Sequence, residues 1–182
     1  MKCITLFLLS SFLLACSQKP KKDIMPINAS IYHIDCSCYE DTLLDKKSPD
    51  TMRLLSFWIS LKNPNDIDMY IPIRSVFDKR YCSEIGIFMD TTRLHRYMVT
   101  KDINFNTLKA HSWTSIRIKL FEVLDKNALG ATHDIKKLLK KIKFRYVKCK
   151  TDALYCNKEI ADIHFVIYDS LKIEYKRARC DE

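Results

Sequence analysis

Glycine is scarce in this chain: its 182 residues include only 2, Gly86 and Gly130. Gly-rich phosphate loops and dinucleotide-binding fingerprints need several glycines close together, because the backbone must turn tightly and approach the phosphates. Two isolated glycines therefore exclude both kinds of nucleotide site.

The chain also lacks the short motifs of common hydrolases. Its five histidines lie in no Gly-x-Ser-x-Gly elbow and no His-Glu-x-x-His helix; they are His33, His95, His111, His133 and His164. Acidic pairs such as Glu40-Asp41 fall in expected turns, where solvation explains them. A triad assembled from distant residues stays open, since triads depend on geometry rather than order. We expect no enzyme and assign no catalytic residue.

A short apolar leader opens the chain. Lys2 supplies a positive start, and residues 4–14 are apolar except for Thr5, Ser10 and Ser11. A membrane-spanning helix needs roughly 20 apolar residues, so this run is too short to be a permanent span. We expect residues 1–15 to be a signal peptide that leaves together with Cys3.

The leader ends in Leu13-Leu14-Ala15-Cys16. These four residues resemble the lipobox of bacterial lipoproteins at every position. The resemblance implies cleavage before Cys16, diacylglycerol on its sulfur and usually a third acyl chain on its new amino group. Two or three buried chains anchor a protein durably, whereas one binds only marginally. Cys16 is the predicted lipid-attachment site, and an ordinary signal peptide is the alternative.

Residues 16–27 are expected to form a lipidated tether. In the lipoprotein family, Asp directly after the cysteine tends to retain the protein at the inner membrane, and Ser17 stands there instead. The following Lys19, Pro20, Lys21 and Lys22 are basic, unlike the acidic surface-export signals of some lineages. We expect the periplasmic side of the outer membrane, with surface exposure open. The lysines are interpreted as a solvated linker, or alternatively as contacts with anionic headgroups.

The formal net charge of +9 limits the choice of partners. A basic balance suits nucleic acid or acidic surfaces. Outside the cytoplasm we expect no nucleic acid, and anionic lipid, glycan or an acidic protein fits better. Lysine-rich solubility is the simpler interpretation.

Six cysteines remain after Cys3 and Cys16 are set aside. An even number in an oxidising compartment predicts up to three disulfides. Cys149 and Cys156 enclose a short polar segment that suits a hairpin loop. Cys36 and Cys38 share a strand face, which is awkward for a mutual bond, so their expected partners are Cys82 and Cys180.

Alternating apolar residues predict several strands. Residues 31–39 place Tyr32, Ile34, Cys36 and Cys38 on one face. Residues 52–62 place Leu55, Phe57, Ile59 and Leu61 together, and an Asn63-Pro64-Asn65-Asp66 turn with residues 69–73 completes a predicted hairpin. Further expected strands cover residues 86–89, 94–99, 112–121 and 144–149, and residues 160–175 as one strand or as two joined near Asp169-Ser170.

Residues 132–143 change period. Ile135, Leu138, Leu139 and Ile142 recur at helical spacing, with Thr132 as the expected cap. The opposite side carries the basic surface Lys136, Lys137, Lys140 and Lys141. We interpret this helix as a cap on the open end of the fold, or alternatively as a contact for an anionic membrane or acidic partner.

About seven short strands and one helix predict a mainly β fold, a β-sandwich in residues 28–182. The order resembles the immunoglobulin-like modules of small secreted lipoproteins, on the strength of the apolar strand, Asn-Pro turn and second apolar strand in residues 57–73. Trp58 and the cysteines depart from the antibody Cys-Trp-Cys spacing. We interpret Trp58 as a core residue.

His33, Cys36 and Cys38 form a compact group of metal-ligand types. On a strand, however, His33 points away from both cysteines, a fourth ligand is missing nearby, and oxidation competes for the thiols. The sequence therefore predicts disulfides, no metal and no cofactor.

The sequence favours a membrane-anchored envelope lipoprotein that acts as a binding or scaffold module for another envelope component. The alternative is a module that binds glycan or a small ligand, with Trp58, Trp113 and the lysine-bearing faces as contacts. No particular small molecule is identifiable. An uncharacterised hydrolase ranks third.

Overall fold

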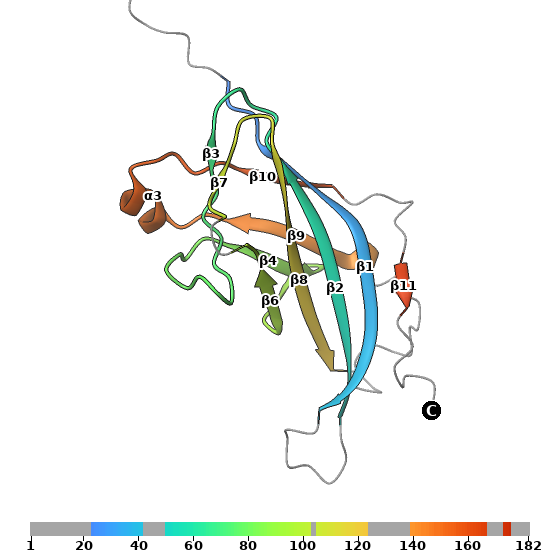
Figure 1. Cartoon of the computed structure of the whole chain (residues 1–182). Helices are drawn as coiled ribbons and strands as arrows, with labels where there is room; N and C mark the ends of the chain where they lie inside the picture. The colour runs from blue at the N-terminus through green and yellow to red at the C-terminus, as the bar shows by residue number, and fades with distance from the viewer. Residues whose placement is uncertain (1–22, 42–49, 103–104, 124–138, 167–172, 176–182) are drawn as a thin grey trace, which may run out of the picture.

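The computed structural model describes residues 23–41, 50–102, 105–123, 139–166 and 173–175 (Figure 1). The described chain is mainly β, as predicted. Its strands are β1 (Ile27–Asp41), β2 (Asp50–Lys62), β3 (Met69–Tyr70), β4 (Glu84–Met89), β5 (Thr92–Leu94), β6 (Tyr97–Thr100), β7 (Thr107–Leu108), β8 (Trp113–Val123), β9 (Ile142–Val147), β10 (Ile163–Val166) and β11 (Ile173–Tyr175). Helix α3 (Lys150–Cys156) separates β9 from β10. None of the described helices is both long and apolar enough to cross a bilayer.

The larger sheet has the strand order β10-β1-β2-β8-β6, and β11 also pairs with β1. The long strands β1, β2 and β8 are antiparallel to one another and curve side by side in Figure 1. Strands β10 and β11 both run parallel to β1, at its beginning and at its middle. The segment predicted as one strand or two over residues 160–175 therefore contains two short strands.

Alternation of side chains decides which face of this sheet is buried. Leu55, Phe57, Ile59 and Leu61 of β2 are fully buried, as predicted, and Ile116, Ile118 and Leu120 of β8 lie on the same inner face. Burying each such side chain contributes about 1.5–3 kcal/mol. Trp58 points to the opposite, outer face and is half-buried there, so its interpretation as a core residue was wrong.

A β-bulge at Tyr32 changes the expected faces of β1. Ile31 pairs with Ile59 but His33 pairs with Trp58, so Tyr32 is an extra residue on β1. The bulge shifts the alternation by one position. Ile31 and Ile34 consequently both point inward, whereas Tyr32 is 51 % exposed and does not share the face of Ile34 and Cys36.

A second sheet, of order β5-β4-β9, covers the inner face of the first. The ring of Phe57 in β2 meets the ring of Phe144 in β9 edge to face, with centroids 5.2 Å apart. Ile85, Ile87 and Ile142 complete this side of the core. The chain therefore forms two packed β layers (Figure 1).

The predicted hairpin of residues 52–73 was wrong. The pairs of β2 are β1 and β8, whereas β3 pairs with β7 in a small separate sheet. The side chain of buried Asn63 explains the change, because its amide donates to the carbonyl oxygens of Ile67, Leu108 and Lys109. These bonds tie the turn to the segment around β7, and the strand that follows the turn pairs there.

Two further boundaries differ from the prediction. The expected strand 94–99 divides into β5 and β6, and the expected loop before residue 112 contains β7. The predicted helix 132–143 lies largely outside the described residues; residues 139–141 are helical, but Ile142 and Lys143 already belong to β9.

With so few glycines, other residues adopt left-handed backbone conformations at turns. Asp90, His111 and Asn157 have φ values of 54°, 54° and 49°. Asn and Asp tolerate this region better than most residues, and Asn157 uses it to end α3.

Candidate functional site

A disulfide joins the two connections at one end of the β4–β9 pair. Cys82 and Cys149 continue the ladder in which Glu84 faces Val147, and their Cα atoms lie 5.7 Å apart. The sequence predicts Cys82 as a partner of Cys36 or Cys38, and its bond to Cys149 shows that this prediction is wrong. The segment between Cys149 and Cys156 is helix α3 rather than a hairpin loop.

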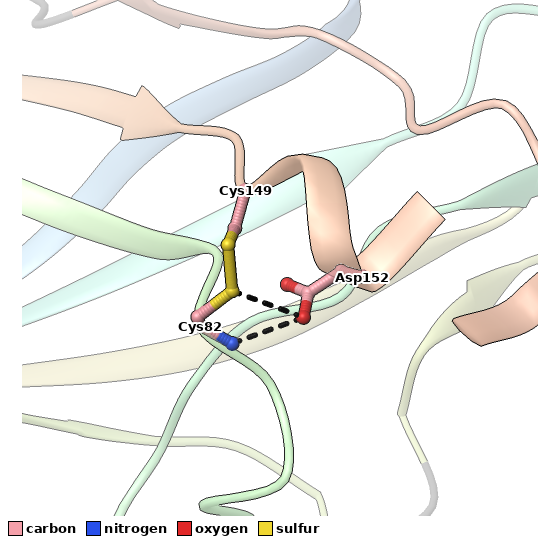
Figure 2. A group of neighbouring side chains, drawn as sticks. All are labelled: Cys82, Cys149 and Asp152. Carbon is pink, nitrogen blue, oxygen red and sulfur yellow. Dashed lines mark hydrogen bonds between the residues drawn. A yellow bond between two sulfur atoms is a disulfide. The ribbon is translucent and has the colours of Figure 1, made fainter. Parts of the chain in front are cut away.

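Asp152 locks the same junction from the first turn of α3 (Figure 2). Its buried carboxylate accepts hydrogen bonds from the backbone N–H of Cys82 at 3.1 Å and of Ser83 at 2.6 Å. The hydroxyl of Ser83 accepts one in return from the N–H of Cys149 at 2.9 Å. The connection before β4 and the connection after β9 are thus held together by a covalent bond and three hydrogen bonds.

The connection before β4 is also ordered within itself. Buried Asp78 receives Nε and Nη2 of Arg80 at 3.1 and 3.2 Å, and its own N–H donates to Ser75 Oγ. The hydrogen bond from Arg80 holds the pKa of the Asp78 carboxyl below its usual value. A charge-assisted bidentate pair of this kind keeps the backbone of residues 75–80 in one shape.

Lys101 contacts the same connection before β4 through the ring of Tyr81. Its ammonium group is buried, donates to the carbonyl oxygen of Phe105 and to the side chain of Asn106, and lies 5.6 Å from the centre of the Tyr81 ring. Desolvation lowers the pKa of Lys101 to about 8, although the nearby Asp78 carboxylate opposes that shift. Buried groups with displaced pKa values mark candidate sites. Here the contacts of Lys101 with Phe105, Asn106 and Tyr81 hold the protein's own segments together.

Large apolar side chains stand exposed on both tied connections. Phe77 is 61 % exposed beside Val76, and Leu154 of α3 is 78 % exposed. Phe77 and the three residues after it line an open hollow of about 540 Å³. Exposed cations flank both apolar groups: Lys79, Arg80, Lys150 and Lys158. We call the exposed side chains of residues 76–80 and 150–158 the loop surface.

A second polar cluster lies on the outer face of the larger sheet. Nε2 of His33 is 2.7 Å from Oδ1 of Asp35 and 3.5 Å from Oε2 of Glu174. The indole N–H of Trp58 donates to the other oxygen of Asp35 at 3.4 Å. Arg117 stacks over Trp58, with its guanidinium carbon 4.7 Å from the ring centre.

The predicted site residues are scattered by this fold. Cys36 is buried in the core on the face opposite His33, so the expected separation of His33 from it is confirmed. Cys38 lies in β1 and Cys156 ends α3. Lys140 and Lys141 are exposed just before β9, and Trp113 is 69 % exposed at the start of β8. The remaining predicted sites lie outside the described residues: Cys16, Cys180, Lys136 and Lys137.

Sequence reasoning missed Phe77, Lys101, Asp152, Leu154 and Glu174. The short apolar run Ala153-Leu154-Tyr155 between polar residues was the one signal available for the loop surface. Glu174 lies near His33 because β11 pairs with β1, and no local sequence pattern predicts this strand pairing. No family model, no curated protein and no solved structure matches this chain.

Proposed function

We propose that this chain is a membrane-anchored envelope lipoprotein whose β module binds another envelope component through the loop surface. Cys16 supplies the anchor, on the evidence of the Leu13-Leu14-Ala15-Cys16 motif. The observation that carries the binding role is the exposure of Phe77 and Leu154 on two connections that Cys82–Cys149 and Asp152 hold together.

We further propose that the module is immunoglobulin-like. In immunoglobulin domains one sheet has strands in the order A-B-E-D, and the other contains C, F and G. The order β1-β2-β8-β6 fits A-B-E-D, and the neighbours β4 and β9 fit C and F. Strand β10 takes the place of G in the chain order, but it pairs with β1.

This assignment gives the loop surface a position with a known use. Residues 63–83 become the B–C connection and residues 148–162 the F–G connection. In variable domains these two connections lie at the same end of the sandwich and carry binding residues. Here the disulfide joins the end of the first to the start of the second.

Preorganisation supports binding at this surface. Ordering side chains and loops on association costs free energy, so a surface that is already rigid keeps more of its contact energy. Apolar anchors surrounded by polar groups are typical of the residues that dominate such interfaces. The exposed Lys79, Lys150 and Lys158 favour a partner whose complementary surface is acidic, whereas the charge of Arg80 is balanced by Asp78.

Site-specific photo-crosslinking in intact cells tests the binding role. A photoreactive residue at position 77 or 154 of the lipidated full chain is expected to give the same adduct with an envelope protein. Tyr32 is the control, since it is 51 % exposed but lies on β1, outside both connections. An adduct of the same size and yield at position 32, or none at 77 and 154, would refute the proposal.

The anchor has its own test. Cys16→Ala is expected to abolish incorporation of labelled palmitate and to release the chain from the membrane fraction. Cys3→Ala is the control, because Cys3 lies within the proposed signal peptide and its loss should change neither readout. Palmitate labelling that persists in Cys16→Ala would remove the basis for the anchor.

The hollow beside Phe77 favours a glycan or small ligand as the second candidate. Its volume of about 540 Å³ falls within the range of about 300–1,000 Å³ that is usual for ligand sites. Phe77→Ala would then weaken binding in a glycan array, whereas Leu154→Ala would leave it unchanged. A protein partner instead predicts loss of the crosslinked adduct from position 154 in Phe77→Ala and from position 77 in Leu154→Ala.

A further inference from the structure

The outer face of the larger sheet brings three metal-ligand side chains together. His33 and Asp35 are two residues apart on β1, beyond the bulge, and therefore share a face. Glu174 is the parallel-strand neighbour of Asp35 on β11. One donor atom from each of the three lies within 4.8 Å of the others. We propose that His33, Asp35 and Glu174 bind a divalent transition-metal cation, zinc foremost.

The distances suit a zinc ion. Zinc bonds to imidazole nitrogen and carboxylate oxygen are about 2.0–2.2 Å long, so ligand atoms around a tetrahedral zinc lie roughly 3.3 Å apart. The separation of His33 Nε2 from Glu174 Oε2 is 3.5 Å, already close to that value. The 2.7 Å contact between His33 and Asp35 is a hydrogen bond. A cation takes the place of the proton between them when the two side chains separate slightly. A neutral imidazole then carries its one proton on Nδ1, whereas a protonated imidazole releases its Nε2 proton to solvent.

Neighbouring groups hold Asp35 in position for this role. Trp58 Nε1 donates to Oδ2 of Asp35 at 3.4 Å, and Nη2 of Arg117 lies 3.8 Å from the same oxygen. Arg117 is itself held by Ser56 Oγ at 3.2 Å. These contacts direct Oδ1 toward His33, as outer-shell hydrogen bonds orient metal ligands in general.

The site would also be accessible. The side chains of His33 and Glu174 are 28 % and 53 % exposed, whereas that of Asp35 is buried. Three protein ligands leave a coordination position for water or for an atom of a bound partner, which distinguishes such sites from closed structural ones.

The described residues contain one other three-donor group, Cys82, Cys149 and Asp152. Zinc binds cysteine as the thiolate, and both of these sulfurs are joined in the disulfide. Oxidation therefore closes that group to a metal and leaves the histidine–carboxylate group open. The earlier expectation of no metal rested on His33 with Cys36 and Cys38; the donors proposed here are different.

Calorimetric titration with Zn²⁺ tests the proposal on the full chain in detergent, stripped with chelator and kept free of reductant. One zinc per chain is expected. Glu174→Gln and His33→Gln should each weaken binding at least about tenfold, the smaller effect known for outer-shell changes. His111→Gln is the matched control: His111 contacts Asp66 at 3.0 Å but belongs to no three-donor group among the described residues, so its affinity should match wild type.

Co²⁺ substitution identifies the ligand atoms. Binding at the proposed site should produce cobalt d–d bands without a thiolate charge-transfer band. A thiolate band, unchanged affinity in Glu174→Gln, or no stoichiometric zinc in the wild type would each overturn the proposal. Because Glu174 is exposed, Glu174→Gln keeps the test valid even where His33→Gln fails to fold, as circular dichroism will show.

Discussion

The two polar clusters of this molecule use an aspartate in opposite ways. At the loop end, Asp152 is enclosed by the N–H groups of Cys82 and Ser83 and sits against a disulfide. On the sheet face, Asp35 turns one oxygen toward His33 and the exposed Glu174. Figure 1 places α3 and β11, which bring in these clusters, on opposite sides of the molecule. The closed cluster stabilises a shape, and the open one keeps donor atoms within reach of a ligand.

Removing the disulfide should give the largest effect and test whether the loop end is structural. Cys82→Ala/Cys149→Ala releases a link between residues separated by 67 positions. The expected loss in free energy of unfolding is about 2–5 kcal/mol, because the unfolded chain regains entropy. Denaturant unfolding monitored by fluorescence measures it. A loss below about 1 kcal/mol would show that the disulfide is not the main source of stability at the loop end.

Asp152→Ala should come next. It leaves the N–H groups of exposed Cys82 and buried Ser83 without their acceptor. An unsatisfied buried donor costs about 1–3 kcal/mol, and an exposed donor costs less because water replaces its partner. We expect a total loss of about 2–3 kcal/mol in chemical denaturation. Asp162→Ala is the control, since Asp162 makes an ion pair with Lys148 near the surface, and such pairs contribute at most about 1 kcal/mol. Equal losses in the two variants would contradict the closed-cluster interpretation.

Lys101 predicts a pH dependence at the loop end. Burial lowers its pKa from 10.5 to about 8, so between these values the unfolded chain binds more protons than the folded one. Stability therefore rises with pH in this window, by about 1–2 kcal/mol from pH 8 to pH 9.5. The rise should disappear in Lys101→Met and remain in Lys109→Met, whose lysine is exposed. Denaturation series at several pH values check the difference.

Glu174→Gln should have the smallest effect without metal. Its contact with His33 is 3.5 Å long and exposed, and such pairs contribute up to about 1 kcal/mol. The melting temperature should then change little in the presence of chelator. Added Zn²⁺ should raise the melting temperature of the wild type more than that of the variant, because a ligand bound only by the folded state stabilises it in proportion to its affinity. An equal rise in the variant would show that Zn²⁺ binds without Glu174, and the contrast between an open and a closed cluster would then fail.

Local patterns predicted the strands well and their partners poorly. Alternation identified β2 together with its buried face, since one sheet face must be apolar, and it also identified β8 as a strand. The same rule placed Tyr32 inward, because a bulge changes the alternation without any change in composition. The Asn-Pro turn suggested a hairpin, but Asn63 bonds to carbonyl groups some 45 positions away, which periodicity does not report.

The sites separate in the same manner. Cys16 stands in a contiguous motif, so four residues suffice to predict a lipid anchor. Cysteine count predicted disulfides but not the bond between Cys82 and Cys149, since six cysteines allow 15 pairings. That bond follows from the register of β4 against β9, and the meeting of His33 with Glu174 follows from the parallel pairing of β1 with β11. Burial periodicity and short motifs depend on residues that are close in the sequence, whereas strand pairing depends on how the whole core packs.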